Sequence, residues 1–332
     1  MTALRIIFMG TAELSGASLE TLAREERFQI AAVVTQPDKP KGRALRPQPS
    51  PVKSLAQKLN LPVLQPERAR DEEFIAGLRG LEPELIVVVA YGQILPPDIL
   101  ELPRFGCLNV HTSLLPKYRG AAPIQRAIAN GDTETGVTIM KMDTGLDTGD
   151  IVAQHRAPIQ PEDDSATVHD RLAQLGATLL AQTIPDYVAG KIPPRPQPVE
   201  GVSYAAKIKK EDGHIDWNQP ANTIRNRLRA FTPWPGAFTF LKTELKPQLL
   251  KIWKAEVAEV ISDGDSAARR PCPGEILSAG KTGIIVACGK GALRVLELQR
   301  EGGRRMTAAE FLGGNPLKAG GSFSQPDSRN PV

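Results

Sequence analysis

The sequence has 332 residues, of which 41% are hydrophobic and 23% are charged, so it is long enough for two domains with buried cores. No run of about 18 apolar residues occurs in it, and a transmembrane helix is therefore not expected. Its three cysteines, Cys107, Cys272 and Cys288, are odd in number and far apart, which argues against a disulfide framework and a cysteine-based metal motif. We expect a cytoplasmic protein, because free thiols suit a reducing compartment.

The first 160 residues alternate short apolar runs with amphipathic segments. The apolar runs predict β-strands at residues 5–10, 29–36, 84–92, 106–111, 136–142 and 150–159. Segments with a helical spacing of apolar residues lie between them at 18–26, 50–59, 71–80 and 122–131, and a longer helix is predicted at 165–188. This alternation predicts an α/β fold with a doubly wound, mainly parallel sheet.

The composition changes after the long helix. Residues 190–201, GKIPPRPQPVEG, are rich in proline and predict a semi-rigid linker. The apolar runs that follow are short and separated by Gly and Pro, which predicts a smaller, OB-like β-barrel. The predicted organisation is an α/β domain at 1–189, a linker at 190–206, a barrel domain at 207–314 and a disordered tail at 315–332.

Charge is divided unevenly along the chain, although the net charge is only +4. Residues 1–200 carry 21 Lys and Arg against 24 Asp and Glu, whereas residues 201–332 carry 20 against 13. A basic C-terminal part is compatible with a polyanionic partner and, equally, with a merely solvated basic surface.

Two sets of basic residues could contact the phosphates of a nucleic acid. One lies in a loop at residues 35–53, which is much longer than the usual βα connection of about 2–6 residues. The other lies in the C-terminal part. The candidate contacts are Lys39, Lys41, Arg43 and Arg46 in the loop, and Lys207, Lys209, Lys210, Arg304 and Arg305 in the C-terminal part. The alternatives are a solvated insertion and an ordinary charged surface.

A polar pair interrupts the predicted strand GCLNVH. Asn109 and His111 are two residues apart, so their side chains leave the same side of the strand. They lie near its carboxyl end, where ligands bind in open α/β sheets. A single His is more often structural or exposed than catalytic, but here an uncharged amide donor accompanies it.

The segment MDTGLDTGD offers carboxylates to this pair. Asp143, Asp147 and Asp150 lie in a loop punctuated by glycines, and any of them could orient the imidazole. An amide, an imidazole and a carboxylate together suit acyl-type transfer, in which an oxyanion is stabilised and protons move. A polar turn is the structural alternative, and the spacing does not match a calcium-binding loop.

No nucleophile for a covalent intermediate is evident. The sequence has no G-x-S-x-G elbow, and we expect Cys107 to face away from Asn109 and His111. Direct transfer to an amine is therefore favoured over an acyl-enzyme. A dinucleotide site is disfavoured as well, because FMGTAELSG lacks the G-x-G-x-x-G spacing.

These segments together resemble the methionyl-tRNA formyltransferase family, in the same order and over nearly the whole chain. The blocks NVHTSLLPKYRG and MDTGLDTGD are similar to those of folate-dependent formyl-transfer domains. KEDGHIDW, PWPGAF, and GRRM followed by EFL, resemble the tRNA enzymes rather than the shorter glycinamide ribonucleotide formyltransferases. One departure is GTAEL at residues 10–14, where the family usually has GTPEF, and this leaves the shape of the methionine pocket open.

The resemblance implies a transferase of protein biosynthesis and one-carbon metabolism. It would move the formyl group of its cosubstrate, 10-formyltetrahydrofolate, to the α-amine of methionine on initiator tRNA for translation initiation, with no metal. The family's catalytic residues match Asn109, His111 and Asp147. Its folate-binding segments match two runs, Ser113, Leu114, Leu115 and Pro116, and Tyr91, Gly92, Gln93 and Ile94.

The resemblance also assigns the basic loop to an insertion that enters the acceptor stem of the tRNA, with Arg43 as the best candidate contact. The C-terminal domain would help to hold the tRNA, and we expect a monomer. Two other functions stay open. One is a folate-dependent formyltransferase that acts on an amino-sugar nucleotide, and the other is a non-catalytic RNA-binding protein on a formyltransferase scaffold.

Overall fold

The computed structural model describes residues 3–41, 46–241, 247–259 and 271–324, apart from the side chains of Lys41 and Arg46. The chain divides into two compact units. The first comprises Met1–Pro123, Glu134–Pro158 and Thr167–Ala206, and the second comprises Ile124–Thr133, Ile159–Ala166 and Lys207–Val332. The second unit therefore includes two short segments, Ile124–Thr133 and Ile159–Ala166, that lie within the range 1–189 expected for the α/β domain. Within the described ranges, no helix has both the length and the apolar character needed to cross a membrane.

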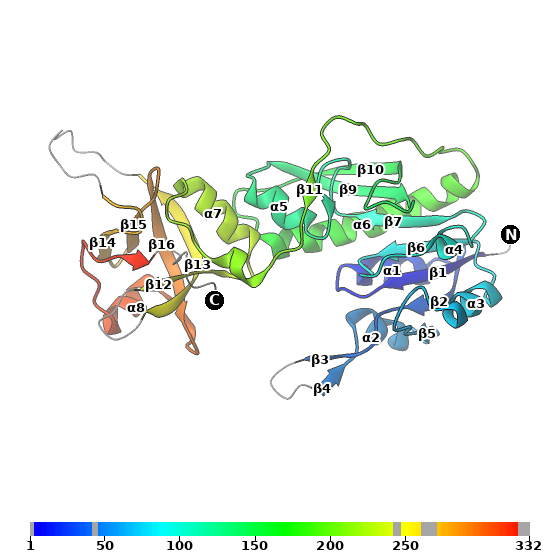
Figure 1. Ribbon diagram of the computed structural model, residues 1–332, viewed down its shortest axis with the longest axis horizontal. Helices are drawn as coiled ribbons and strands as arrows, with labels where there is room; N and C mark the ends of the chain where they lie inside the picture. Colours follow the sequence, from blue (N-terminus) through cyan, green and yellow to red (C-terminus); the bar gives the residue numbers. More distant parts are fainter. Residues whose placement is uncertain (1–2, 42–45, 242–246, 260–270, 325–332) are drawn as a thin grey trace. The chain divides into compact units, whose positions relative to one another are not determined.

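A seven-stranded sheet forms the centre of the first unit (Figure 1). Its strands lie in the order β10-β9-β7-β6-β1-β2-β5. β1, β2, β5, β6 and β7 are parallel, whereas β9 is antiparallel to both of its neighbours. The strands are β1 (Leu4–Gly10), β2 (Phe28–Val34), β5 (Val63–Leu64), β6 (Leu85–Val89), β7 (Cys107–His111), β9 (Glu134–Lys141) and β10 (Asp150–Pro158). The predicted doubly wound, mainly parallel sheet is confirmed.

Helices cover both faces of this sheet. Leu78 of α3 packs with Ile7 and Ile86 on one face. On the other face, Gly176 of α6 lies so close to Val110 that a Cβ at this position would be 2.8 Å from the valine Cγ1. The helices of this unit are α1 (Ser15–Arg24), α2 (Pro51–Lys58), α3 (Glu72–Gly80), α4 (Pro97–Leu100) and α6 (Ser165–Val188), whereas α5 (Pro123–Ala129) belongs to the second unit apart from Pro123.

The sheet order determines where a ligand can reach the first unit. β1 has β2 on one side and β6 on the other, so the winding of the sheet reverses at this point. Because β1, β6 and β7 are parallel, the loops after their carboxyl ends meet at one edge of the sheet. All five residues of β6, LIVVV, are buried, which holds this edge on a rigid strand.

Short strands complete the first unit. β3 (Lys39–Lys41) and β4 (Arg46–Gln48) form a two-stranded hairpin in the long basic loop. β8 (Arg119–Gly120) pairs in parallel with β11 (Tyr204–Ala205). The second pairing lies within the segment that we expected to be a linker, so residues 190–206 run along the first unit rather than free of it.

The second unit contains a curled antiparallel sheet, with the strand order β14-β15-β16-β13-β12-β18 and with β17 paired to β16. Its strands are β12 (Ala237–Leu241), β13 (Gln248–Ala258), β14 (Ile276–Gly280), β15 (Gly283–Ala287), β16 (Ala292–Arg300), β17 (Arg305–Thr307) and β18 (Phe323–Ser324). α7 (Ala221–Ala230), α8 (Ala308–Gly314) and the 3₁₀ turn η1 (Lys210–Gly213) accompany them. The small, barrel-like β-domain agrees with the prediction.

The structure differs from the expected disordered tail at residues 315–324. Phe323 pairs with Leu241 of β12 on one side and donates its backbone N–H to the Gly274 carbonyl on the other, at 2.9 Å. Its ring is 2% exposed and stacks on Trp217 with 5.6 Å between centroids. These residues are ordered because the Phe323 ring is buried. The Gly- and Ser-rich composition around Phe323 did not indicate this burial. Residues 325–332 of the expected tail lie outside the described residues.

Phe323→Ala should lower the stability of the second unit, because it removes a buried ring and leaves a cavity against Trp217. We expect a loss of about 3 kcal/mol or more in the free energy of unfolding. Calorimetry of the full chain would detect it as a lower melting temperature. Lys318→Ala, at an exposed position nearby, is the control, and equal melting of both variants would contradict the stabilising role of the buried Phe323 ring.

Candidate active site

β7 carries Asn109 and His111 to the edge of the sheet where β1 and β6 also end. Asn109 lies between Val88 of β6 and Met140 of β9 in the strand register, so neighbouring strands fix its position on both sides. Asn109 is half-buried, and His111 is only 6% exposed. Within the described part of the chain, no hydrogen bond occupies the Asn109 side-chain amide. Its donors are therefore available to a bound molecule.

A backbone carbonyl determines which nitrogen of His111 is available for chemistry. The Nε2 atom lies 2.9 Å from the Tyr118 carbonyl oxygen. A carbonyl can only accept a hydrogen bond, so Nε2 carries a proton and donates it. The other nitrogen, Nδ1, lies 3.7 Å from Oδ2 of Asp147. Nδ1 is thus the ring nitrogen that can gain or lose a proton in the site.

Of the three candidate aspartates, only Asp147 meets the imidazole. Its side chain is 15% exposed, and its Oδ2 accepts a hydrogen bond of 2.7 Å from the Gly120 backbone N–H. Asp143 instead stabilises its own loop, by accepting from the Gly145 N–H at 3.0 Å and the Thr148 hydroxyl at 2.8 Å. Asp150 begins β10 and pairs with Lys141. The structure therefore distinguishes alternatives that the sequence left open.

The Asp147 loop is a strained turn with little room around it. Asp147 has φ of +52°, a left-handed conformation that residues with a Cβ seldom adopt. Two residues later, a Cβ on Gly149 would lie 1.9 Å from the Lys141 carbonyl oxygen, so only glycine fits. The turn is therefore specified by its neighbours rather than by local preference.

The segment Ser113–Pro116 borders this site and is held by internal hydrogen bonds. The buried Ser113 hydroxyl donates to the Lys117 carbonyl at 2.6 Å, and the Leu115 N–H donates to Thr138 at 3.1 Å. Leu114 and Pro116 are partly exposed. The Ser113 side chain and the Leu115 backbone thus shape the segment, while the side chains of Leu114 and Pro116 are partly accessible to a ligand. Their contact with folate stays a prediction.

The segment Tyr91–Ile94 follows β6 at the same edge. The Tyr91 carbonyl accepts from the Thr11 hydroxyl at 2.8 Å and from Gln36 Nε2 at 2.9 Å, which ties this segment to the loops after β1 and β2. Gln93 accepts from the Ala69 N–H at 2.8 Å, so its amide is also used within the protein. Ile94 is 90% exposed and points an apolar side chain to solvent. The predicted folate contacts of this segment are not tested by these distances.

Tyr91 itself is buried, and its hydroxyl has no hydrogen-bond partner among the described residues. Burial raises the pKa of this phenol to about 12, so it is neutral at physiological pH. The departure at GTAEL lies beside this segment. The backbone N–H groups of Thr11 and Ala12 both donate to the Ala90 carbonyl, so the turn is anchored although it lacks the usual proline.

Comparisons with known proteins show which proteins this chain resembles. The sequence model of the formyl transferase family matches residues 4–184, and that of the formyl transferase C-terminal domain matches residues 207–316. The methionyl-tRNA formyltransferase of Citrifermentans bemidjiense is 48% identical over 328 residues, 99% of each chain. That of Myxococcus xanthus is 50% identical over 322 residues, 97% of each chain.

The chain belongs to the methionyl-tRNA formyltransferase family.

More distant solved structures share its fold. The N-formyltransferase of Helicobacter canadensis, solved with folinic acid and dTDP-3-aminofucose, superposes with a TM-score of 0.62 at 20% identity, covering 88% of this chain and 98% of that one. The sugar 3N-formyltransferase WlaRD superposes with a TM-score of 0.63 at 20% identity, covering 89% and 97%. These likenesses support the formyltransferase fold of this family member.

The basic residues predicted to bind tRNA differ in how accessible the structure makes them. Lys207, Lys209 and Lys210 are exposed at the start of the second unit. Arg304 and Arg305 are exposed too, but they form ion pairs with Glu310 at 2.8 Å and Glu297 at 2.5 Å. In the basic loop, Lys39 donates to Gln36 at 2.5 Å. Arg43 and the side chains of Lys41 and Arg46 lie outside the described residues.

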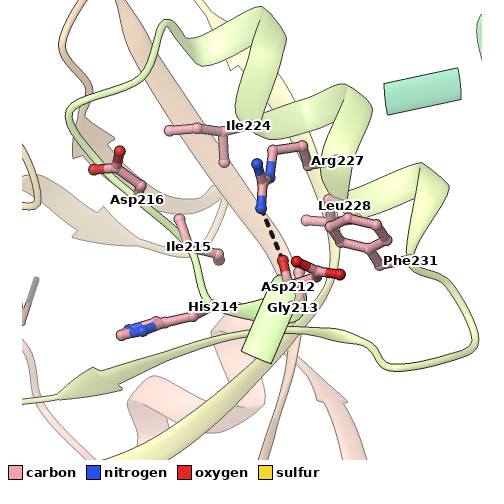
Figure 2. Close-up of a pocket in the computed structure, with 10 residues that line it drawn as sticks. Asp212, Gly213, His214, Ile215, Asp216, Ile224, Arg227, Leu228 and Phe231 are labelled. Atoms are coloured by element: carbon pink, nitrogen blue, oxygen red, sulfur yellow. Dashed lines mark hydrogen bonds between the residues drawn. The ribbon is translucent and has the colours of Figure 1, made fainter. Parts of the chain in front are cut away.

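A small hollow in the second unit lies between residues 212–216 and helix α7 (Figure 2). Arg227 donates to the Asp212 carbonyl across it at 2.9 Å, while His214 points away and stacks on Phe238. Its free volume of about 10 Å³ has room for a single water molecule at most. The hollow is therefore a packing feature and not a ligand site.

Residues that the sequence did not indicate hold Asp147 in place. Gly120 has φ of +116°, and a Cβ there would lie 2.8 Å from the Ala205 carbonyl, so the glycine in the KYRG block was the available signal. Arg119 and Gln197 had no comparable signal, because they contact each other over 78 residues of chain and Gln197 contacts Asp147 over 50.

The expected orientation of Cys107 was wrong. Every second residue of a strand points to the same side, so Cys107 lies on the side of β7 that carries Asn109 and His111. It packs there with Ile86 and Val88. It is nevertheless no nucleophile for this site. Cys107 is 1% exposed, its thiol donates to the Ile99 carbonyl at 3.6 Å, and burial raises the pKa of the thiol to about 12.

A thiol titration tests this assignment of the cysteines. Cys107 and Cys288 are buried, and burial raises the pKa of each thiol to about 12, whereas Cys272 is exposed. At pH 8 the native protein should therefore react rapidly with about one equivalent of an aromatic disulfide reagent, and with three after unfolding. Rapid loss of two or more thiols in the native protein would show that a buried cysteine is accessible.

Proposed function

We propose that this chain transfers the formyl group of 10-formyltetrahydrofolate to the α-amine of methionine on initiator tRNA, giving N-formylmethionyl-tRNA for translation initiation. The observation that carries the proposal is similarity at 48–50% identity to methionyl-tRNA formyltransferases over nearly the full length of both chains. The chemistry is supported by the placement of Asn109 and His111 on β7 and of Asp147, in the loop before β10, against the His111 ring.

The residues around this edge suit a folate. A folate presents a flat heteroaromatic ring with apolar faces and polar edges, and when bound the formyl form supplies an activated carbonyl carbon. The exposed apolar side chains Ile94 and Leu146, at 90% and 62% exposure, could cover the ring faces. Residues Tyr91–Ile94 and Ser113–Pro116 would hold the molecule.

Asn109 is the donor placed for a developing negative charge. The amide side chain lies at the carboxyl end of β7 and has no partner among the described residues. When an amine attacks a formyl carbonyl, the oxygen becomes an oxyanion, and a fixed donor stabilises it by about 3–4 kcal/mol. The Asn109 amide is a neutral donor. Unlike a cationic donor, it does not repel the positive charge that the attacking amine carries until it loses its proton.

His111 and Asp147 are suited to proton movement. The attacking amine loses a proton as its bond to the formyl carbon forms, and the departing nitrogen gains one as its bond to that carbon breaks. His111 Nδ1 can hold a proton between these events, because Nε2 is already occupied by the Tyr118 carbonyl. Asp147, 3.7 Å from Nδ1, stabilises the imidazolium that results and can hold a water or the amine beside it.

The second unit favours a tRNA acceptor over a nucleotide sugar. Residues 201–332 carry 20 Lys and Arg against 13 Asp and Glu, and residues 207–316 match the formyl transferase C-terminal domain. The sugar formyltransferases are only 20% identical, whereas the tRNA formyltransferases exceed 40%. A sugar nucleotide acceptor is therefore the weaker alternative.

Substitution of the catalytic residues should separate chemistry from binding. We expect His111→Ala to lower kcat by about 10²-fold or more and Asn109→Ala by about 10²- to 10³-fold. Both variants should bind 10-formyltetrahydrofolate with nearly unchanged affinity, as measured by calorimetry. His155→Ala, at an exposed histidine of β10, is the matched control. Near-normal turnover in His111→Ala would refute the role of this imidazole.

The acceptor is tested by comparing methionyl initiator tRNA with free methionine in the same transfer assay. Only the charged tRNA should be formylated, and its binding should weaken steeply with salt, because phosphate contacts release counterions. Lys207→Ala should make the slope of log K for tRNA binding against log salt concentration less negative by about one. Lys58→Ala, at an exposed lysine of α2, is the control. A flat salt response, or equal formylation of free methionine, would contradict tRNA recognition.

A further inference from the structure

The Pro-rich segment 190–206 is hydrogen-bonded to the catalytic edge of the first unit, by which we mean the carboxyl end of β7 with the loops that carry Tyr118 and Asp147. Arg195 and Ile151 exchange two backbone hydrogen bonds of 2.8 and 2.9 Å beside the start of β10. Ser203 accepts from the Tyr118 N–H through its hydroxyl at 2.9 Å and from the Arg119 N–H through its carbonyl at 2.8 Å. Figure 1 shows the segment running from the end of α6 back past β10 to β11. It is therefore fixed on both sides of the Asp147 turn.

Gln197 lies between these fixed points and uses its whole side-chain amide on the catalytic edge. Its Nε2 donates to the carbonyls of Asp147 and Gly149, both at 2.8 Å. Its Oε1 accepts from the Nε and Nη2 atoms of Arg119, at 3.1 and 2.7 Å. Carbonyls only accept and a guanidinium only donates, so the amide fits in one orientation alone. Arg119 therefore directs both donors of Gln197 at the turn.

The carbonyls that Gln197 binds are those of the turn that presents the catalytic carboxylate. Asp147 has φ of +52°, a conformation that a residue with a Cβ leaves when it is not held by its surroundings. Its side chain is held by Gly120, but its carbonyl is held by Gln197. Gln197 bridges the carbonyls of Asp147 and Gly149 and so opposes a change of this backbone conformation, on which the position of the carboxylate depends.

We propose that Gln197, oriented by Arg119, is a positioning residue that holds Asp147 in the conformation required for formyl transfer. The inference rests on the proposed function, in which Asp147 acts on His111. Gln197 lies 50 residues away along the chain and touches neither His111 nor Asn109 through any hydrogen bond of the described residues. It acts through the backbone of Asp147.

Gln197→Glu is the sharpest variant. It keeps the size of the side chain and its acceptor toward Arg119, but the atom that faces the two carbonyls can no longer donate. Gln197→Met is the second variant, because it is uncharged and similar in volume. Val199→Ala, 91% exposed in the same segment, is the matched control. Melting temperatures of the full chain show that each variant is folded.

We expect both Gln197 variants to lower kcat for methionyl initiator tRNA roughly 10- to 100-fold, as for a catalytic group displaced by about 1 Å. The KM values for tRNA and for 10-formyltetrahydrofolate should stay within about threefold, because binding groups are untouched. Val199→Ala should behave as the unmodified protein. Unchanged kcat in folded Gln197→Glu, or a loss that lies entirely in KM, overturns the positioning role.

A double-mutant cycle with Asp147→Asn shows whether Gln197 acts through Asp147. In single-turnover assays, Gln197→Glu should change the residual rate of Asp147→Asn by less than about twofold. A further loss of 10-fold or more in that background overturns the inference. If Asp147→Asn alone kept full activity, the proposed catalytic role of Asp147 would fail as well. If Asp147→Asn were inactive and Gln197→Glu unaffected, only the positioning role would fail.

Discussion

The hydrogen bond from His111 Nε2 to the Tyr118 carbonyl determines how the rest of the site can work. It fixes the tautomer, so the proton-exchanging nitrogen is Nδ1, which faces Asp147. The bond in turn requires a loop that returns toward β7 within seven residues, and Tyr118 achieves this with φ of +62°. Both groups that flank the imidazole, Tyr118 and Asp147, therefore belong to residues in left-handed conformations, each of which costs roughly 1–2 kcal/mol.

Such conformations persist only where the surroundings determine them more strongly than local preference does. Here the parallel strands supply a rigid base, since every residue of β6 is buried and Asn109 has strand partners on both sides. Glycines supply space where other backbone passes close by, at Gly149 beside Lys141 and at Gly120 beside Ala205. The edge of the sheet that carries the candidate active site thus depends on contacts between segments far apart in the chain.

That dependence explains which features the sequence could predict. The alternation of apolar runs was sufficient for the sheet, and Asn109 and His111 followed from a spacing of two along one strand. The family resemblance pointed to Asp147, but the residues by themselves did not decide among Asp143, Asp147 and Asp150, because only the structure shows that Asp143 binds its own loop. Phe323 was missed because its burial depends on Trp217, over a hundred residues earlier. The orientation of Cys107 was a plain error, since 107, 109 and 111 share one side of a strand.

The Pro-rich segment is the most instructive case. Prolines predicted a linker because they cannot donate to a sheet, but the residues between them can. Arg195 and Ser203 bond through their backbones, and Gln197, flanked by Pro196 and Pro198, uses its side chain. Pro196 has a fixed φ, and Pro198 restricts residue 197 to extended conformations. The chain therefore loses little conformational freedom when Gln197 binds the Asp147 turn, so a few hydrogen bonds are enough to hold it.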